Sequence, residues 1–224
     1  MHTAVVDQNG TDLRAVKEAL CDPDYVNVFF SSDRLTPEQM NLLYNVADVN
    51  VLMSSNEGWG LSLTEAMITG TMIIPNVTGG MQDQCRFENE KGEWIDFDAD
   101  FPSNHRGTYT KCGDWAVPVF PSNISLAGSP PTPYIFDDRA NPEDVAKAIQ
   151  TVYELGPEER KKRGLKGREW ALSDEAGFTA AKMSQRVGET IDEGFKKFKP
   201  RPRFEIIKAG KIPTKYVKHK ILNY

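Results

Sequence analysis

The chain has 224 residues, of which 39% are hydrophobic and 26% charged, and its formal net charge is −5. This composition is typical of a soluble globular protein with a core of its own, and the acidic balance speaks against nucleic acid as a partner. No apolar run approaches the length of a membrane span, and the first residues lack the pattern of a signal peptide.

Cysteine and histidine are scarce. Cys21, Cys85 and Cys112 are far apart, and the chain has three histidines. Three widely spaced cysteines and three histidines are typical of a protein in a reducing compartment. Their spacing matches neither a disulfide framework nor a zinc-binding motif. We therefore expect a cytoplasmic protein without a metal centre, and attachment at a membrane surface stays open.

The first 80 residues alternate between strand and helix patterns. Short apolar runs predict strands over 2–6, 26–31, 49–54 and 71–76, and helical spacing predicts helices over 11–21, 36–47 and 61–70. Thr36 followed by Pro37 is a typical helix start. The alternation predicts an α/β fold with a Rossmann-like parallel sheet flanked by helices.

The alternation stops after Gly79. We interpret residues 81–138 as a long irregular insertion, attached to the domain by the segments 114–122 and 132–136. Asp137 and Asp138 are interpreted as acids of a turn before a helix. Helices are predicted over 141–156, 156–173 and 174–198, so the expected domain covers residues 1–198 and an extended basic tail covers 199–224.

The stretch SSNEGWGLSLTEAM, residues 54–67, places two acids and two glycines between a predicted strand and a predicted helix. Ligands of open α/β sheets bind beyond the carboxyl ends of strands, and a helix start near Leu61 would offer free N–H groups to a phosphate. Glu57 lies before that helix and Glu65 one turn inside it. A nucleotide sugar would suit this pattern, although the helix dipole alone also favours acids near a helix start.

Residues 42–80 as a whole resemble the hallmark segment of retaining GT-B glycosyltransferases of the group-1 type. The shared features are a helix ending in Ala-Asp, an apolar strand, the loop EGWG, the helix LSLTEAM, a further strand and a Gly-Gly loop. Glu57 and Glu65 match the family's pattern of two glutamates separated by seven residues. The resemblance implies the C-terminal, donor-binding half of a GT-B fold.

The resemblance also implies roles for individual residues. Glu57, the catalytic candidate, would bind hydroxyls of the donor sugar, and Glu65 would bind the ribose. The remaining donor-binding candidates present main-chain groups to the sugar and diphosphate, line the pocket or border the cleft: Asn56, Gly58, Trp59, Gly60, Leu61, Gly79 and Gly80. The resemblance implies no metal and no cofactor beyond the nucleotide-diphosphate sugar.

The sequence departs from the family pattern in two respects. The N-terminal half with the acceptor side is not evident, and neither is the Arg/Lys pair that neutralises the diphosphate. Arg34, Arg86 and Lys91 are the nearest basic residues, and we interpret them as surface charges. We therefore expect a hexosyltransferase-type enzyme that needs an N-terminal half and whose acceptor is unknown.

Two alternatives remain open at this point. The first is a non-catalytic module that binds a nucleotide or nucleotide sugar. The second, an NAD-type oxidoreductase, ranks last, because Leu63 stands where the dinucleotide motif needs its third glycine.

Overall fold

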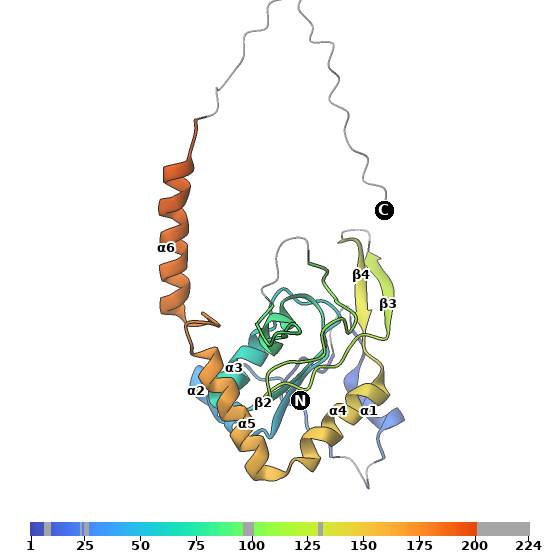
Figure 1. Cartoon of the computed structure of the whole chain (residues 1–224). Coiled ribbons are helices and arrows are strands. Elements are labelled where there is room, and N and C mark those ends of the chain that lie inside the picture. The colour runs from blue at the N-terminus through green and yellow to red at the C-terminus, as the bar shows by residue number, and fades with distance from the viewer. Residues whose placement is uncertain (7–9, 23, 25–26, 96–100, 130–131, 201–224) are drawn as a thin grey trace, which may run out of the picture. The chain divides into compact units, whose positions relative to one another are not determined.

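The computed structural model describes residues 1–200 except 7–9, 23, 25–26, 96–100 and 130–131, and the chain divides into two compact units, 1–179 and 180–224. The first unit contains most of the regular elements (Figure 1), which are α1 (Leu13–Leu20), α2 (Pro37–Val46), β1 (Val49–Leu52), α3 (Leu61–Thr69), β2 (Met72–Pro75), the 3-10 turns η1 (Gly79–Met81) and η2 (Asp83–Cys85), β3 (Asn123–Ser129), β4 (Thr132–Arg139), α4 (Pro142–Glu154) and α5 (Gly156–Ala171). The second unit begins with α6 (Ala180–Lys197).

The helix starts follow from local sequence. Asp12 accepts hydrogen bonds from the amides of Arg14 and Ala15 at the start of α1. Thr36 and Gln39 form a reciprocal capping box ahead of α2, and Pro37 occupies the first turn, where its missing N–H costs no helix bond. The predicted helices over 11–21, 36–47 and 61–70 are thus confirmed.

The parallel sheet lies at the centre of the first unit. β1 and β2 pair in parallel, with Val49 opposite Met72 and Leu52 opposite Pro75. The segment 115–119 continues this sheet on the far side of β2, through parallel bridges from Ala116 to Ile73 and from Val119 to Asn76. The predicted α/β class with a parallel sheet and flanking helices is confirmed, and so is the attachment of the insertion through 114–122.

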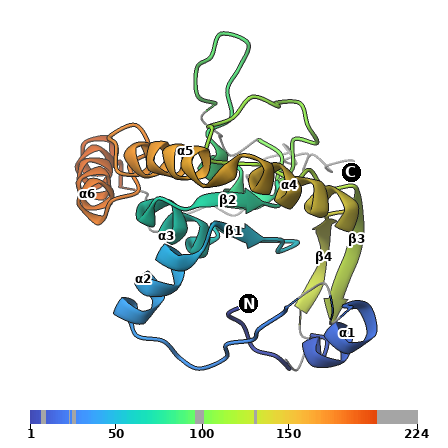
Figure 2. The ribbon, with the colours of Figure 1, turned by 90° about the horizontal axis from the view of Figure 1, so that it is seen from below.

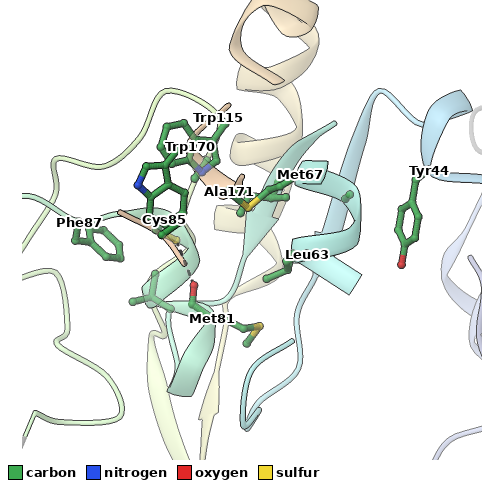
Figure 3. Close-up of a cluster of buried hydrophobic side chains, with 14 residues drawn as sticks. Tyr44, Leu63, Met67, Met81, Cys85, Phe87, Trp115, Trp170 and Ala171 are labelled. Atoms are coloured by element: carbon green, nitrogen blue, oxygen red, sulfur yellow. Dashed lines mark hydrogen bonds between the residues drawn. The ribbon is translucent and has the colours of Figure 1, made fainter. Parts of the chain in front are cut away.

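Both faces of β2 are buried, as parallel strands covered by helices require. Ile73 packs into a cluster with Leu63 and Met67 of α3, and Figure 3 shows this cluster reaching Trp115 and Trp170. Met72 and Ile74 face the opposite way and pack with the buried residues of α4, Ala148 and Val152. Tyr44 of α2 and Trp170 of α5 belong to the same cluster as Ile73, so α4 is the helix that packs on the Met72 face. Figure 2 shows α3, α4 and α5 close to β2.

The predicted insertion is more regular than expected. Its last third forms an antiparallel hairpin of β3 and β4, so the interpretation of 81–138 as irregular is wrong there. The segment 132–136, predicted to attach the insertion to the domain, pairs with β3, and its Tyr134 and Phe136 side chains are exposed. Asp137 and Asp138 lie in β4 and are buried, which corrects their interpretation as acids of a helix-preceding turn.

The first two predicted strands are also largely wrong. The segments 2–6 and 26–31 meet at a single parallel bridge between His2 and Ser31, supported by main-chain bonds of Ser31 with Met1 and Thr3. Residues 25–26 lie outside the described residues. Neither segment pairs with β1 among the residues that the structure describes, so these short apolar runs lack a partner in the described sheet.

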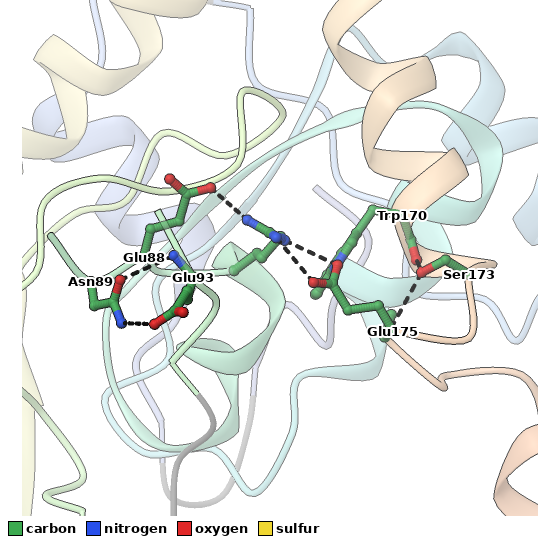
Figure 4. A network of polar contacts seen from close by, with 8 residues as sticks. Glu88, Asn89, Glu93, Trp170, Ser173 and Glu175 are labelled. Atoms are coloured by element: carbon green, nitrogen blue, oxygen red, sulfur yellow. Dashed lines mark hydrogen bonds and ion pairs between the residues drawn. The ribbon is translucent and has the colours of Figure 1, made fainter. Parts of the chain in front are cut away.

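Arg86 was expected to be a solvated surface charge, and the structure corrects this. Its guanidinium makes two hydrogen bonds, of 3.0 and 3.1 Å, to Glu175 and a further ion pair with Glu88 (Figure 4). Glu175 also accepts a 2.7 Å hydrogen bond from the indole of Trp170. These bonds, led by those from Arg86, lower the pKa of Glu175 and join the start of the insertion to the end of α5.

The boundary that the structure gives lies at residues 179 and 180, whereas the predicted domain ended at residue 198. The predicted basic tail over 199–224 falls almost entirely outside the described residues. In the part of the chain that is described, no helix combines the length and apolar character that crossing a membrane requires.

Candidate donor-binding site

Two loops meet in close backbone contact at the carboxyl ends of β1 and β2. The amide of Gly80 donates to the carbonyl oxygen of Glu57, 3.3 Å away. A Cβ atom added to Gly79 would overlap that same oxygen, and one added to Gly80 would overlap the oxygen of Gly58. At Gly79 and Gly80 the two main chains therefore approach more closely than any side chain allows. The predicted role of these glycines at the border of the donor cleft stays a prediction.

The amino end of α3 lies in this loop region. Gly60 occupies its N-cap position at φ 80°, a left-handed conformation that favours glycine, and no side chain caps the helix. Leu61, the first helical residue, is exposed. The Leu63 amide donates to the carbonyl oxygen of Gly60 at 3.0 Å. The preceding amides of the first turn, which no side chain caps, and the positive end of the helix dipole provide a position suited to an anion.

The carbonyl groups of this loop are held by Gln84, a residue that the sequence analysis did not identify. Its buried side-chain amide donates to the oxygens of Trp59 at 2.6 Å and Gly60 at 3.2 Å. Its own oxygen accepts from Thr64, whose hydroxyl in turn accepts from the Trp59 indole. Through these bonds Gln84 ties the 59–60 backbone to η2, next to the amino end of α3.

Replacing Gln84 by leucine is expected to destabilise the first unit by about 1–3 kcal/mol, because the carbonyl oxygens and Thr64 would lose buried partners. Thermal unfolding followed by tryptophan fluorescence measures this change. Gln150→Leu, at an exposed position of α4, is the matched control. Equal thermal midpoints for the two variants would show that the Gln84 hydrogen bonds do not contribute to the stability of the first unit.

Glu65 lines a hollow of about 680 Å³ between α2 and α3, named here the α2–α3 hollow. Its Oε2 accepts a 2.7 Å hydrogen bond from the hydroxyl of Tyr44, a residue of α2. Burial, followed by this bond, raises the pKa of Tyr44, so the phenol stays protonated and donates. Arg34, which is exposed as expected of a surface charge, and Thr36 also line the hollow.

The structure does not gather all the predicted residues around one hollow. Glu57 is half-buried and is not among the residues that line the α2–α3 hollow, and Asn56 is exposed next to it in the chain. Trp59 directs its ring inward, where it packs edge-on against Phe178 at 5.0 Å, so its contribution to a ligand would come from its main chain. Within the described residues, no three His, Cys, Asp or Glu side chains cluster closely enough to hold a metal ion.

Taken together, the first unit is a mixed α/β domain with a parallel sheet, flanking helices and an uncapped helix start at the carboxyl edge of the sheet. This architecture is consistent with a Rossmann-like half of a GT-B fold. Residues 24–100 match the family model described as glycosyl transferases group 1, a match that covers less than half of the chain. No curated protein matches the chain. The matched range contains β1, α3, β2 and the predicted donor-binding residues.

Proposed function

We propose that the first unit binds a nucleotide-diphosphate sugar and acts as the donor-binding half of a retaining, hexosyltransferase-type glycosyltransferase. The observation that carries this proposal is the uncapped amino end of α3 at the carboxyl edge of the sheet, with Glu65 one turn further on. The family match over residues 24–100 supports glycosyl transfer as the reaction class. An N-terminal half would supply the acceptor side, and no metal is required by the proposed mechanism.

Each group of the donor has a proposed partner. The diphosphate rests at the amides of Gly60 and Leu61, and Glu57 binds hydroxyls of the sugar. Glu65 binds the ribose hydroxyls: Tyr44 holds Oε2 at 2.7 Å, so Oε1 stays available as an acceptor. The nucleoside would then occupy the α2–α3 hollow, whose volume of about 680 Å³ lies in the range of small-molecule sites.

The chemical task of these groups is electrostatic. Breaking the bond between sugar and diphosphate develops negative charge on the leaving oxygen and positive charge on the sugar ring. The helix start stabilises the leaving group without reorganising, and the Glu57 carboxylate stabilises the ring. Retention would follow from delivery of the acceptor hydroxyl on the side that the diphosphate leaves.

One observation favours a second function. Glu57 does not line the α2–α3 hollow, so the residues around Glu65 would bind a bare nucleotide without help from the sugar. A non-catalytic nucleotide-binding module is therefore the alternative. A turnover assay with the donor, with and without an added N-terminal half, separates the two functions.

The experiment that tests the proposal is calorimetric titration with UDP, GDP and ADP and with their sugar derivatives. Glu65→Ala should weaken bare nucleotides and nucleotide sugars alike by about 10- to 100-fold, the value of hydrogen bonds to a charged group. Glu57→Ala should weaken only the sugar derivatives. Glu169→Ala, an exposed acid on α5, is the matched control. Equal losses for both ligand types in both variants would contradict the assigned roles.

A further inference from the structure

A second hollow lies in the insertion, away from Glu65. Its volume is about 580 Å³, and it is lined by the loop 101–109 together with Ile124 of β3 and Asp138 of β4. We name it the insertion hollow. Its lining combines aromatic rings, an imidazole, an amide, a carboxylate and the side chain of Arg106, a mixture typical of small-molecule sites that orient a ligand by a few polar groups.

His105 carries a buried hydrogen-bonding atom without a partner. The residue is 4% exposed, and burial lowers its pKa, so the imidazole is neutral near pH 7. Its Nδ1 accepts from the amide of Tyr109 at 3.5 Å, which places the ring proton on Nε2. In the described part of the chain Nε2–H has no acceptor. His105 lines the hollow and its Nε2–H is shielded from solvent, so a ligand hydroxyl would reach this donor after a small shift of the ring or of its neighbours and would supply the acceptor that it lacks.

Flat apolar surface and further hydrogen-bonding groups flank this imidazole. The rings of Phe101 and Tyr109 are nearly parallel, at 24° with centroids 6.2 Å apart. Each oxygen of Asp138 accepts one bond, at 3.2 Å from Asn104 and 2.7 Å from Thr78, and each retains a lone pair for another donor. A sugar ring has the complementary surface, since its C–H faces pack on aromatic rings and its hydroxyls both donate and accept.

The hollow is joined directly to the loops of the donor site. The carbonyl oxygen of Ser103 accepts from the amide of Gly79 at 2.8 Å and from the side chain of Gln82 at 2.8 Å. The amide of Asp138 donates to the carbonyl oxygen of Ser55 at 2.9 Å. The insertion hollow therefore borders the same carboxyl edge of the sheet as Glu57 and Gly80.

We propose that the insertion hollow binds a neutral sugar, and that this sugar is part of the acceptor. The acceptor role rests on the proposed glycosyl transfer, whereas sugar binding by itself does not. In this arrangement the donor-binding unit also contributes to acceptor recognition, through His105, Asp138 and the Phe101–Tyr109 wall.

Two-dimensional ¹H–¹⁵N NMR of the full chain tests the proposal with glucose, galactose and N-acetylglucosamine as probes, each at about 50 mM to reveal millimolar affinity. At least one sugar should shift the amides of residues 101–109. UDP, added separately, should shift those of residues 57–65. If none of the three sugars shifts the loop amides, the proposal is overturned.

Two variants separate binding from folding. His105→Phe keeps an aromatic ring among Phe87 and Phe120 but removes both the unpaired Nε2–H and the long bond that Nδ1 accepts from the Tyr109 amide, so the thermal midpoint should change little while the sugar shifts disappear. Tyr109→Leu removes half of the wall and should also abolish them. Unchanged shifts in both variants would overturn the proposal. The amide shifts that UDP causes at residues 57–65 show separately whether the proposed donor site binds its ligand. The failure of the sugar-binding proposal can therefore be distinguished from the failure of the proposed function.

Discussion

Replacing Gly79 by alanine is expected to destabilise the first unit by about 2–4 kcal/mol and to weaken nucleotide binding by tenfold or more. The added Cβ would overlap the carbonyl oxygen of Glu57, and the position has φ 52°, where L-residues are strained. The overlapping atom is main chain and cannot rotate aside. The 57–60 loop must therefore move, together with the amides at the start of α3.

Gly58→Ala provides the matched control for stability. Gly58 lies in the facing loop, has no atom within 4 Å of an added Cβ, and is not among the residues with positive φ. Its thermal midpoint should stay close to that of the parent chain, whereas that of Gly79→Ala falls. Calorimetric titration with UDP at a temperature where Gly79→Ala remains folded measures the binding loss. Parental affinity in that variant would mean that the contact between the two loops does not shape the donor site.

The part of the site that could be predicted from sequence is the part encoded locally. A strand, a glycine turn and a helix start follow one another within residues 49–69, so their relative geometry depends on few long-range contacts. Gly60 and Gly70 mark the two ends of α3 in the sequence, and both adopt the left-handed conformation that favours glycine. The sequence pattern therefore predicted the helix and its open end without knowledge of the tertiary structure.

The residues that were missed act over long sequence distances. Gln84 supports the carbonyls of Trp59 and Gly60 from 25 and 24 positions away, and nothing in its neighbourhood distinguishes it from a surface glutamine. The segment 115–119 joins the sheet after a long loop, and its proline and short length are typical of irregular structure. Conversely, the short apolar runs at 2–6 and 26–31 predicted strands that lack a partner in the described sheet. An apolar segment forms a β-strand only where another strand lies next to it and pairs with it.

A second glycine contact fixes the opposite end of α3, and its loss is expected to be equally severe. A Cβ added to Gly164 of α5 would overlap the carbonyl oxygen of Gly70, the residue that ends α3. We expect Gly164→Ala to lower the free energy of unfolding by about 2–4 kcal/mol, because two backbones that are now in contact must separate. Fluorescence of the four tryptophans, all within residues 1–179, follows this unfolding.

Gly188→Ala is the matched control, because Gly188 is also helical but has open space around an added Cβ and lies in the second unit. It should leave the tryptophan transition unchanged.

The two variants expected to be strongly destabilised, Gly164→Ala and Gly79→Ala, should differ in their affinity for UDP. Gly164→Ala displaces α5 from the carboxyl end of α3 and should bind UDP with parental affinity wherever it is folded, whereas Gly79→Ala should not. Equal loss of affinity in both would mean that the anion site depends on the position of the whole helix rather than on the loops around its amino end.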